Sequence, residues 1–255
     1  MSVPITPWLI TPNPRPQADW RLFCFPYAGG AARIYQPWAT ALPLNVEVCA
    51  VELPGHGKRL NKPPITQLDT LIQHLEIAIQ PWLDKPFVFF GHSLGALVAF
   101  ELARSLRQHQ CPIPALLWVS AARAPHLTSP NPPIHQLPRA DFIAELRRYS
   151  GTPDEVLANA ELMELLLPML RADFALLETY RYHDQAPLTC PITAFKGEAD
   201  AIVSLEDIRP WQIHTDAAFT LERVAGDHFF VHNPQTVSLM IQEIARLSHS
   251  YNRVV

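Results

Sequence analysis

The sequence is poor in charged residues and has no long apolar run. Only 17 % of its 255 residues are Asp, Glu, Lys or Arg, and the formal net charge is -4. A chain without a broad basic surface lacks the electrostatic character of a protein that binds nucleic acid or an anionic membrane. No stretch reaches the roughly 18 consecutive apolar residues of a membrane-spanning helix, and residues 1–7 lack the basic and apolar regions of a signal peptide. We therefore expect a soluble, cytoplasmic protein.

Cysteine is also scarce, and nothing in its spacing predicts a disulfide framework or a metal site. The four cysteines lie far apart, and three of them lie in or beside strand-like apolar segments, which is typical of buried free thiols: Cys24, Cys49, Cys111 and Cys190. The eleven histidines include no His-Glu-x-x-His motif. The Gly-x-Gly at residues 55–57 lacks the third glycine and the following helix of a dinucleotide-binding fingerprint. We therefore expect neither a metal nor a dinucleotide cofactor.

The most informative segment, residues 87–101, predicts a strand, a sharp turn and a helix. Residues 87–90 form an uninterrupted apolar run typical of a strand buried on both faces, and from Leu94 onward apolar residues recur at helical spacing. Between them, Gly91-His92-Ser93-Leu94-Gly95 matches the Gly-x-Ser-x-Gly pattern of a nucleophile elbow, whose small residues allow a tight turn that exposes the serine hydroxyl. This context favours Ser93 as a catalytic nucleophile over a serine in a structural glycine turn.

Strands and helices alternate on both sides of this elbow. Apolar runs predict further strands at residues 21–25, 46–51, 115–120, 191–195 and 219–224, and helical spacing predicts helices at 34–42, 66–83 and 234–247. This alternation predicts a single α/β domain over residues 1–255, with a mostly parallel sheet flanked by helices. It is interrupted at about residues 124–187, where helical patterns cover 139–149, 154–159 and 161–182. We expect this insertion to form a lid over an acyl pocket, an ordinary helical cap being the alternative.

Candidates for a catalytic acid and base follow the last two predicted strands. In α/β-hydrolases the nucleophile is followed along the chain by an acid and then by a histidine. Asp200 follows the strand at 191–195 through a glycine turn, and His228 lies in a glycine loop after the last strand. We assign these two residues as acid and base. Other carboxylates remain alternatives for the acid, Glu198 first and then Asp184, Asp207 and Asp227. His92 is next to Ser93 in sequence, but on an elbow its side chain points elsewhere.

The turn at residues 26–30 follows the first strand, and its glycines leave backbone N–H groups open. An α/β-hydrolase places its second oxyanion donor in such a turn, so we assign the two donors to the backbone N–H groups of Ala28 and Leu94, a plain glycine turn being the alternative. These groups together permit acyl transfer. Ser93 would attack an ester or thioester carbonyl, His228 would accept its proton, and water would then deacylate the enzyme. This reaction requires no cofactor.

Five motifs occur together between about residues 21 and 247. They are Phe25-Pro26-Tyr27-Ala28-Gly29-Gly30, Leu53-Pro54-Gly55, Gly91-His92-Ser93-Leu94-Gly95-Ala96, Leu167-Pro168-Met169-Leu170-Arg171-Ala172-Asp173 and Gly226-Asp227-His228-Phe229-Phe230. Their combination closely resembles the type II thioesterases, stand-alone α/β-hydrolases that accompany nonribosomal peptide and polyketide synthases. The resemblance implies a nucleophile, acid and base at Ser93, Asp200 and His228. It also implies removal of stray acyl or aminoacyl groups from the phosphopantetheine arm of acyl or peptidyl carrier proteins, and we expect a monomer.

Three other functions stay open. The catalytic residues alone would equally support a general carboxylesterase or lipase acting on small or lipid esters. A medium-chain fatty acyl-carrier thioesterase shares the same fold. A third alternative is a non-catalytic carrier-binding protein, which has the fold without turnover. The order of Ser93, Asp200 and His228 along the chain argues against this last alternative, because the residues of the site rather than the fold decide function.

Overall fold

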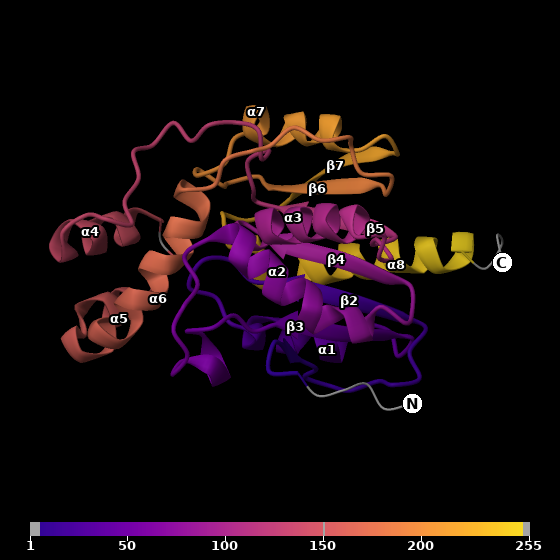
Figure 1. The fold of residues 1–255 in the computed structure, drawn as a ribbon, viewed down its shortest axis with the longest axis horizontal. Coiled ribbons are helices and arrows are strands. Elements are labelled where there is room, and N and C mark those ends of the chain that lie inside the picture. Colours follow the sequence, from indigo (N-terminus) through magenta and orange to yellow (C-terminus); the bar gives the residue numbers. More distant parts are fainter. Residues whose placement is uncertain (1–5, 150, 252–255) are drawn as a thin grey trace.

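A seven-stranded sheet forms the centre of the molecule in the computed structural model, which describes residues 6–149 and 151–251 (Figure 1). The predicted domain limits at residues 1 and 255 therefore lie outside the described residues. The strand order is β1-β3-β2-β4-β5-β6-β7. The strands are β1 (Leu9–Ile10), β2 (Trp20–Phe25), β3 (Val46–Val51), β4 (Phe87–His92), β5 (Leu116–Ser120), β6 (Ile192–Gly197) and β7 (Phe219–Val224).

All strand pairs within this sheet are parallel except that of β1 with β3. The prediction of a mostly parallel α/β sheet is therefore confirmed, and each of the six strands that the apolar runs predict is present. The short strand β1 is a feature that the sequence analysis does not predict, because two residues are too few for an alternating pattern. Strands β2 to β6 are buried along their whole length, whereas the edge strand β7 is half exposed.

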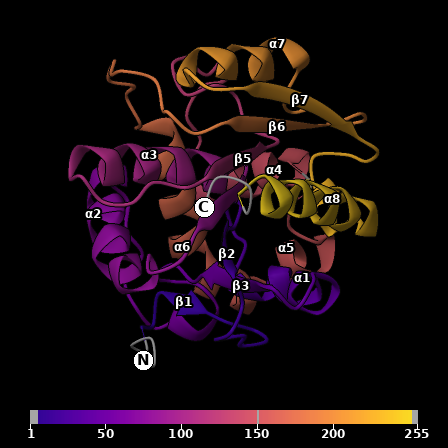
Figure 2. The same ribbon diagram turned by 90° about the vertical axis from the view of Figure 1, so that its right-hand side faces the viewer.

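Helices cover both faces of the sheet (Figure 2). They are α1 (Gln36–Ala41), α2 (Leu68–Ile79), α3 (Leu94–Gln108), α4 (Arg139–Tyr149), α5 (Asp154–Ala158), α6 (Ala160–Glu178), α7 (Leu205–Ile208) and α8 (Pro234–Tyr251). Helices α2 and α3 pack on one face with Phe23 and Phe25, and α1 and α8 pack on the other with Leu22 and Cys24. Successive residues of β2 thus enter opposite layers, as the two-residue period of a strand requires.

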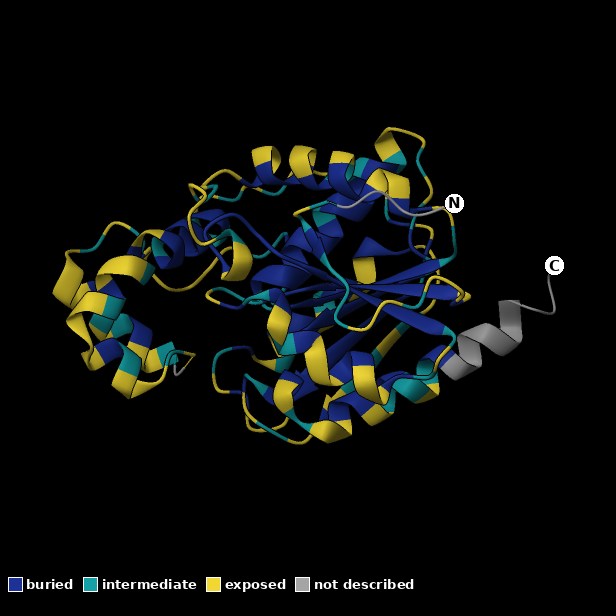
Figure 3. Cartoon of the chain, turned by 90° about the horizontal axis from the view of Figure 1, so that it is seen from below, coloured by how far each residue is buried: buried dark blue, intermediate teal, exposed yellow. Residues whose placement is uncertain are grey.

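Helices α4, α5 and α6 form the predicted helical insertion between β5 and β6 and extend beyond one end of the sheet (Figures 1 and 3). They have a small apolar core of their own, which includes Phe142, Leu157 and Met163. Helix α6 also reaches the main core, because Leu176 packs with the residues around α3. The last helix of the insertion ends at Glu178 rather than at residue 182 as the spacing predicts. Among the described residues, no helix is both long enough and apolar enough to cross a membrane.

The four cysteines are free thiols, as predicted, and they differ in exposure. Cys24, Cys49 and Cys190 are buried, whereas Cys111 is partly exposed at the end of α3. Burial raises the pKa of the thiols of Cys24 and Cys49 and raises the pKa of Cys190 to about 11. Because the thiolate is the reactive species, these three side chains are protected both by inaccessibility and by protonation.

We predict that the native protein at pH 8 reacts rapidly with Ellman's reagent at Cys111 only, and that unfolding exposes the other three thiols. The Cys111→Ser variant should lose the fast phase, while the matched Cys190→Ser variant should keep it. A fast phase that survives in Cys111→Ser would show that one of the buried thiols is accessible, contrary to this packing.

Candidate active site

Ser93 occupies a strained turn between β4 and α3. Its φ of 53° and ψ of -116° lie in a region that non-glycine residues rarely adopt, at a cost of about 1 to 3 kcal/mol. Its backbone N–H donates to the carbonyl of Ser120 at 2.8 Å. A Cβ atom at Gly91 would lie 2.2 Å from the carbonyl oxygen of Gly95, and one at Gly95 would lie 2.0 Å from that of Phe25. Only glycine fits at these two positions, so the Gly-x-Ser-x-Gly pattern is a packing requirement of this turn.

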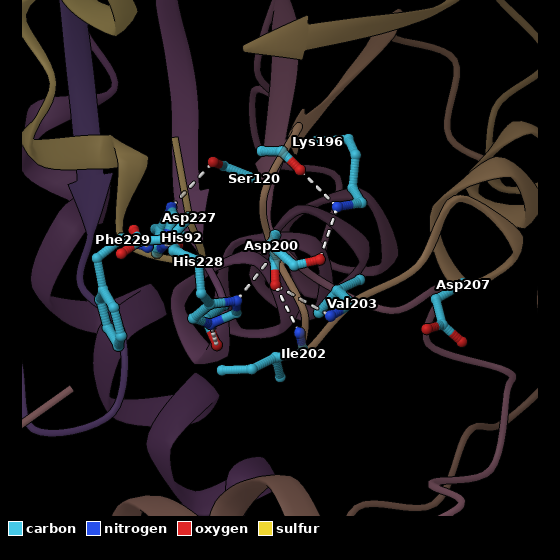
Figure 4. Close-up of polar contacts among 12 residues, drawn as sticks. His92, Ser120, Lys196, Asp200, Ile202, Val203, Asp207, Asp227, His228 and Phe229 are labelled. Carbon is cyan, nitrogen blue, oxygen red and sulfur yellow. Dashed lines mark hydrogen bonds and ion pairs between the residues drawn. The ribbon is translucent and has the colours of Figure 1, made fainter. Parts of the chain in front are cut away.

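The structure brings Ser93, His228 and Asp200 together at the carboxyl ends of three strands. Figure 4 shows His228 beside Asp200. Ser93 follows β4, Asp200 follows β6, and His228 follows β7. Nε2 of His228 is 3.3 Å from Oγ of Ser93, and Nδ1 is 3.0 Å from Oδ2 of Asp200. Because the carboxylate accepts from Nδ1–H, Nε2 of the neutral ring is left free to accept the hydroxyl proton of Ser93.

The other predicted candidates for the acid bind elsewhere. Oδ1 of Asp227 accepts the N–H of Phe229 at 2.8 Å, and Asp207 lies apart from His228 and pairs with Arg123 (Figure 4). Glu198 is exposed, and Asp184 accepts from the hydroxyl of Tyr182 at 3.5 Å. Among the carboxylates of the described residues, the one hydrogen-bonded to His228 is that of Asp200.

Asp200 is held as an anion by its own turn. Its Oδ1 accepts the backbone N–H groups of Ile202 at 2.8 Å and Val203 at 3.1 Å. Burial opposes the charge, but the hydrogen bond and charge of His228 together with these two N–H groups bring the pKa of Asp200 below its ordinary value. The buried ammonium of Lys196 donates to the backbone carbonyls of Gly197 and Asp200, and so ties the turn to β6 (Figure 4).

His92 is a site residue whose contacts the sequence analysis does not predict. It is fully buried, and its Nε2 lies 2.8 Å from the backbone carbonyl of His228 while its Nδ1 lies 2.9 Å from Oγ of Ser120. A carbonyl can only accept, so Nε2–H is the donor, and Nδ1 accepts the hydroxyl of Ser120. Burial, followed by the proximity of His228, lowers the pKa of His92 to about 3. His92 therefore stays neutral and fixes the backbone that carries His228; its ring does not face Ser93 as a base.

The predicted oxyanion donors belong to the start of α3 and to the turn at residues 26–30. Leu94 is the first residue of α3, where backbone N–H groups have no partner within the helix. In the turn at residues 26–30, the N–H of Gly30 donates to Tyr27 and that of Gly29 donates to Asp173. Within the described part of the chain, neither the N–H of Ala28 nor that of Leu94 donates a hydrogen bond. Because Gly95 has no side chain, this turn packs directly against the elbow.

Most of the chain matches a family model, that of the thioesterase domain, over residues 20–245. Linear gramicidin dehydrogenase LgrE of Brevibacillus parabrevis is 44% identical over 239 residues, which are 92% of this chain and 91% of that protein. Gramicidin S biosynthesis protein GrsT of Aneurinibacillus migulanus is 41% identical over 228 residues, 89% of each chain. Among solved structures, the type II thioesterase BorB from the borrelidin biosynthetic cluster has a TM-score of 0.83 and 36% identity, covering 92% of this chain and 96% of that chain.

We predict that the neutral, buried His92 makes the fold sensitive to acid. The pKa of His92 is lowered from 6.5 to about 3, so the unfolded chain binds a proton that the folded chain excludes between these values. Folding stability therefore falls as the pH falls through 6.5, by about 2 to 3 kcal/mol from this residue between pH 7 and pH 4.5.

The free energy of unfolding, measured with urea at both pH values, tests this prediction. The His92→Gln variant should lose about 2 to 3 kcal/mol less stability between pH 7 and pH 4.5 than the unmodified protein does. The matched variant His74→Gln changes an exposed histidine on α2, outside the site, and serves as the control. An equal pH dependence in His92→Gln and the unmodified protein would refute the assignment of a neutral His92.

Proposed function

This chain belongs to the thioesterase domain family, and we propose that it is a type II, editing thioesterase. It is a thioester hydrolase with the α/β-hydrolase fold. The proposed substrates are aberrant acyl or aminoacyl thioesters on the phosphopantetheine arm of carrier proteins that serve peptide or polyketide synthases. The observation that carries this proposal is the agreement of BorB, a type II thioesterase, with 92% of this chain at a TM-score of 0.83. GrsT, a gramicidin S biosynthesis protein, supports the same context.

The proposed reaction has two acyl-transfer steps. His228 accepts the hydroxyl proton of Ser93 as Oγ attacks the thioester carbonyl, and Asp200 stabilises the imidazolium that forms. The oxyanion of the tetrahedral intermediate accepts hydrogen bonds from the N–H groups of Ala28 and Leu94. The C–S bond breaks and His228 returns the proton to the departing thiolate. Water then attacks the acyl-serine with the same base and the same donors, and releases the acid. The support for these roles is the hydrogen-bonded chain from Ser93 through His228 to Asp200.

We propose further that α4, α5 and α6 cover the acyl group as a lid. A Cβ atom at Gly151, in the segment between α4 and α5, would lie 2.7 Å from the ring of Phe229, the residue after His228. The insertion therefore reaches the loop that carries the proposed base. Its core includes Met163 and Met169, whose flexible side chains suit acyl groups of different shape.

The name of LgrE includes a dehydrogenase activity, which we do not propose for this chain. The Gly-x-Gly at residues 55–57 leads into a short 3-10 turn, Gly57–Arg59, rather than into the helix that holds a pyrophosphate in a dinucleotide site. Gly57 also packs against the carboxylate of Glu52, since a Cβ there would lie 2.0 Å from its Oε1. A carboxylate at this position is unfavourable for a phosphate group.

The decisive measurement for the proposed function is acyl release from a loaded carrier protein. We expect acetyl- and aminoacyl-loaded carrier protein to be hydrolysed with a higher kcat/KM than the same acyl groups on a short free thioester, because binding of the protein partner contributes to the transition state. The Ser93→Ala variant, which lacks the proposed nucleophile, measures the background rate. Hydrolysis of free esters with the carrier left loaded would refute the editing role and leave a general esterase. A strong preference for medium-chain over aminoacyl loads would instead indicate a fatty acyl-carrier thioesterase.

A matched pair of variants tests the acid. Asp200→Asn removes the charge that stabilises the imidazolium and should lower kcat by about 10³- to 10⁴-fold. Glu198→Gln neutralises an exposed carboxylate two residues away and should leave kcat within about twofold of the unmodified enzyme. Hydrolysis of p-nitrophenyl acetate, corrected with the Ser93→Ala blank, measures both. A larger loss in Glu198→Gln than in Asp200→Asn would contradict the assignment.

A further inference from the structure

A second buried histidine–carboxylate pair lies outside the proposed triad. His56 is 3% exposed and Asp173 is 2% exposed, and Nε2 of His56 lies 2.8 Å from Oδ2 of Asp173. The same Oδ2 accepts the backbone N–H of Gly29 at 2.7 Å, and Nδ1 of His56 lies 3.1 Å from the carbonyl of Pro54. These contacts join helix α6, the loop after β3 and the turn at residues 26–30, which are far apart in the sequence.

Close packing accompanies these hydrogen bonds. A Cβ atom at Gly29 would lie 2.9 Å from Cδ2 of Leu170, and one at Gly55 would lie 3.4 Å from Cβ of Met169. Both glycines have a positive φ, 80° and 85°, which other residues rarely adopt. Helix α6 therefore rests directly on the backbone of both loops, and Asp173 fixes it there one turn after Leu170.

The hydrogen-bond geometry determines the protonation of His56. The carbonyl of Pro54 can only accept, so Nδ1 carries a proton. Oδ2 of Asp173 already accepts from Gly29 and, as part of a carboxylate, offers no proton to Nε2. Nε2 must therefore carry a proton too, and His56 is an imidazolium. Burial works against this charge, but Asp173 and the carbonyl of Pro54, with Glu52, raise the pKa of His56 above its ordinary value.

The charged groups around this pair come from three elements. Asp173 belongs to α6, and Glu52 lies directly after β3, where burial raises its pKa. Lys58 and Arg59 follow His56 on the same loop and act on Glu52. In the turn at residues 26–30, the hydroxyl of Tyr27 is bound to His232 at 2.8 Å. The charge on His56 is therefore balanced mainly by Asp173.

We propose that His56 and Asp173 are positioning residues for the oxyanion donor. The ion pair holds the N–H of Gly29, and the N–H of Gly30 is bound to Tyr27, so both residues after Ala28 are fixed and the turn keeps one conformation. When His56 loses a proton, one ring nitrogen without hydrogen faces an acceptor oxygen, either of the Asp173 carboxylate or of the Pro54 carbonyl. Because two acceptors repel each other, the pair separates and the turn at residues 26–30 loses its fixed conformation. The inference rests on the proposed roles of Ser93 and Ala28. It goes further by making their geometry depend on the ion pair between His56, on the loop after β3, and Asp173 of α6.

The sign of the expected pH dependence follows from this geometry. A histidine whose folded pKa is raised stabilises its contacts fully below its ordinary value of 6.5 and loses that effect as the pH rises through the folded value. We expect kcat for p-nitrophenyl acetate to fall on the alkaline side with the titration of His56, while KM stays constant, because an oxyanion donor acts in the transition state. If the pair had only a structural role, its titration would change the stability of the fold but would not lower kcat at constant KM.

The unmodified enzyme provides the first test. Its kcat is measured from pH 5.5 to 9.5 against the Ser93→Ala blank, and the ring of His56 is titrated by NMR in protein labelled at histidine carbon, assigned from the His56→Arg spectrum. The pH at the midpoint of the fall in kcat should coincide with the pH at the midpoint of the His56 titration. A kcat that stays constant while His56 titrates would overturn the proposal. Labelling of Ser93 by a fluorophosphonate distinguishes failure of the proposed function from failure of this inference. A native enzyme that is not labelled refutes the proposed catalytic site. A labelled enzyme whose kcat stays constant while His56 titrates refutes only the positioning role.

Three variants provide the second test. Asp173→Asn should lower kcat on the order of 10- to 100-fold with KM little changed, since a misplaced donor loses most of its effect. His56→Arg keeps a permanent positive charge, so it should retain most of kcat at pH 7 and lose the alkaline decline. Glu178→Gln is the matched control. Glu178 lies on the same helix as Asp173 but pairs with His135, which precedes α4, at 2.5 Å, so its loss should change thermal stability but not kcat.

Equal kcat values for Asp173→Asn and Glu178→Gln would overturn the positioning role, as would an unchanged alkaline decline in folded His56→Arg. If Asp173→Asn does not fold, the coincidence of the two midpoints in the unmodified enzyme decides the question alone.

Discussion

The strained turn at Ser93 governs how the sheet, the elbow helix and the neighbouring loops pack together. The turn places a serine hydroxyl above the end of the sheet only because β4 and α3 meet with almost no space between them, and two glycines make that approach possible. A strain of about 1 to 3 kcal/mol at Ser93 persists because β4 and α3 are buried along nearly their whole length. The same close approach brings the turn after β2 against the elbow, because a Cβ atom at Gly95 would lie 2.0 Å from the carbonyl oxygen of Phe25.

Around this turn, backbone carbonyls are as important as the side chains of the proposed triad. His92 binds the carbonyl of His228, and Lys196 binds two carbonyls of the turn that carries Asp200. Each of these buried donors would cost energy if left unpaired, so each loop has one favourable position. The loops at the carboxyl ends of β4, β6 and β7 are far apart in the sequence. These hydrogen bonds fix them relative to one another, so the geometry of the site is set before substrate binds.

The helical insertion has two parts with different roles. Its own small core is formed by α4, α5 and the part of α6 from Met163 to Phe174, while the second half of α6 also packs on the loops after β2 and β3. Asp173 lies in this second half and is bound to both loops. The helix that we propose as part of a lid is in this way physically connected to the backbone that is proposed to stabilise the oxyanion.

The amino-acid sequence alone was enough to predict the main elements and the order of the three proposed catalytic residues. Apolar runs and helical spacing predicted each of the six longer strands and the helices of the insertion, and Ser93, Asp200 and His228 were identified from a local motif and from the strands they follow. These features are local, so a single sequence contains them. The strand β1 and the contacts of His92, Lys196, His56 and Asp173 were decided only by the tertiary structure. His92 meets the backbone of a residue 136 positions away, and Asp173 meets Gly29 across 144 positions. Pairing over such distances depends on how the sheet and α6 pack, and no pattern of neighbouring residues records it.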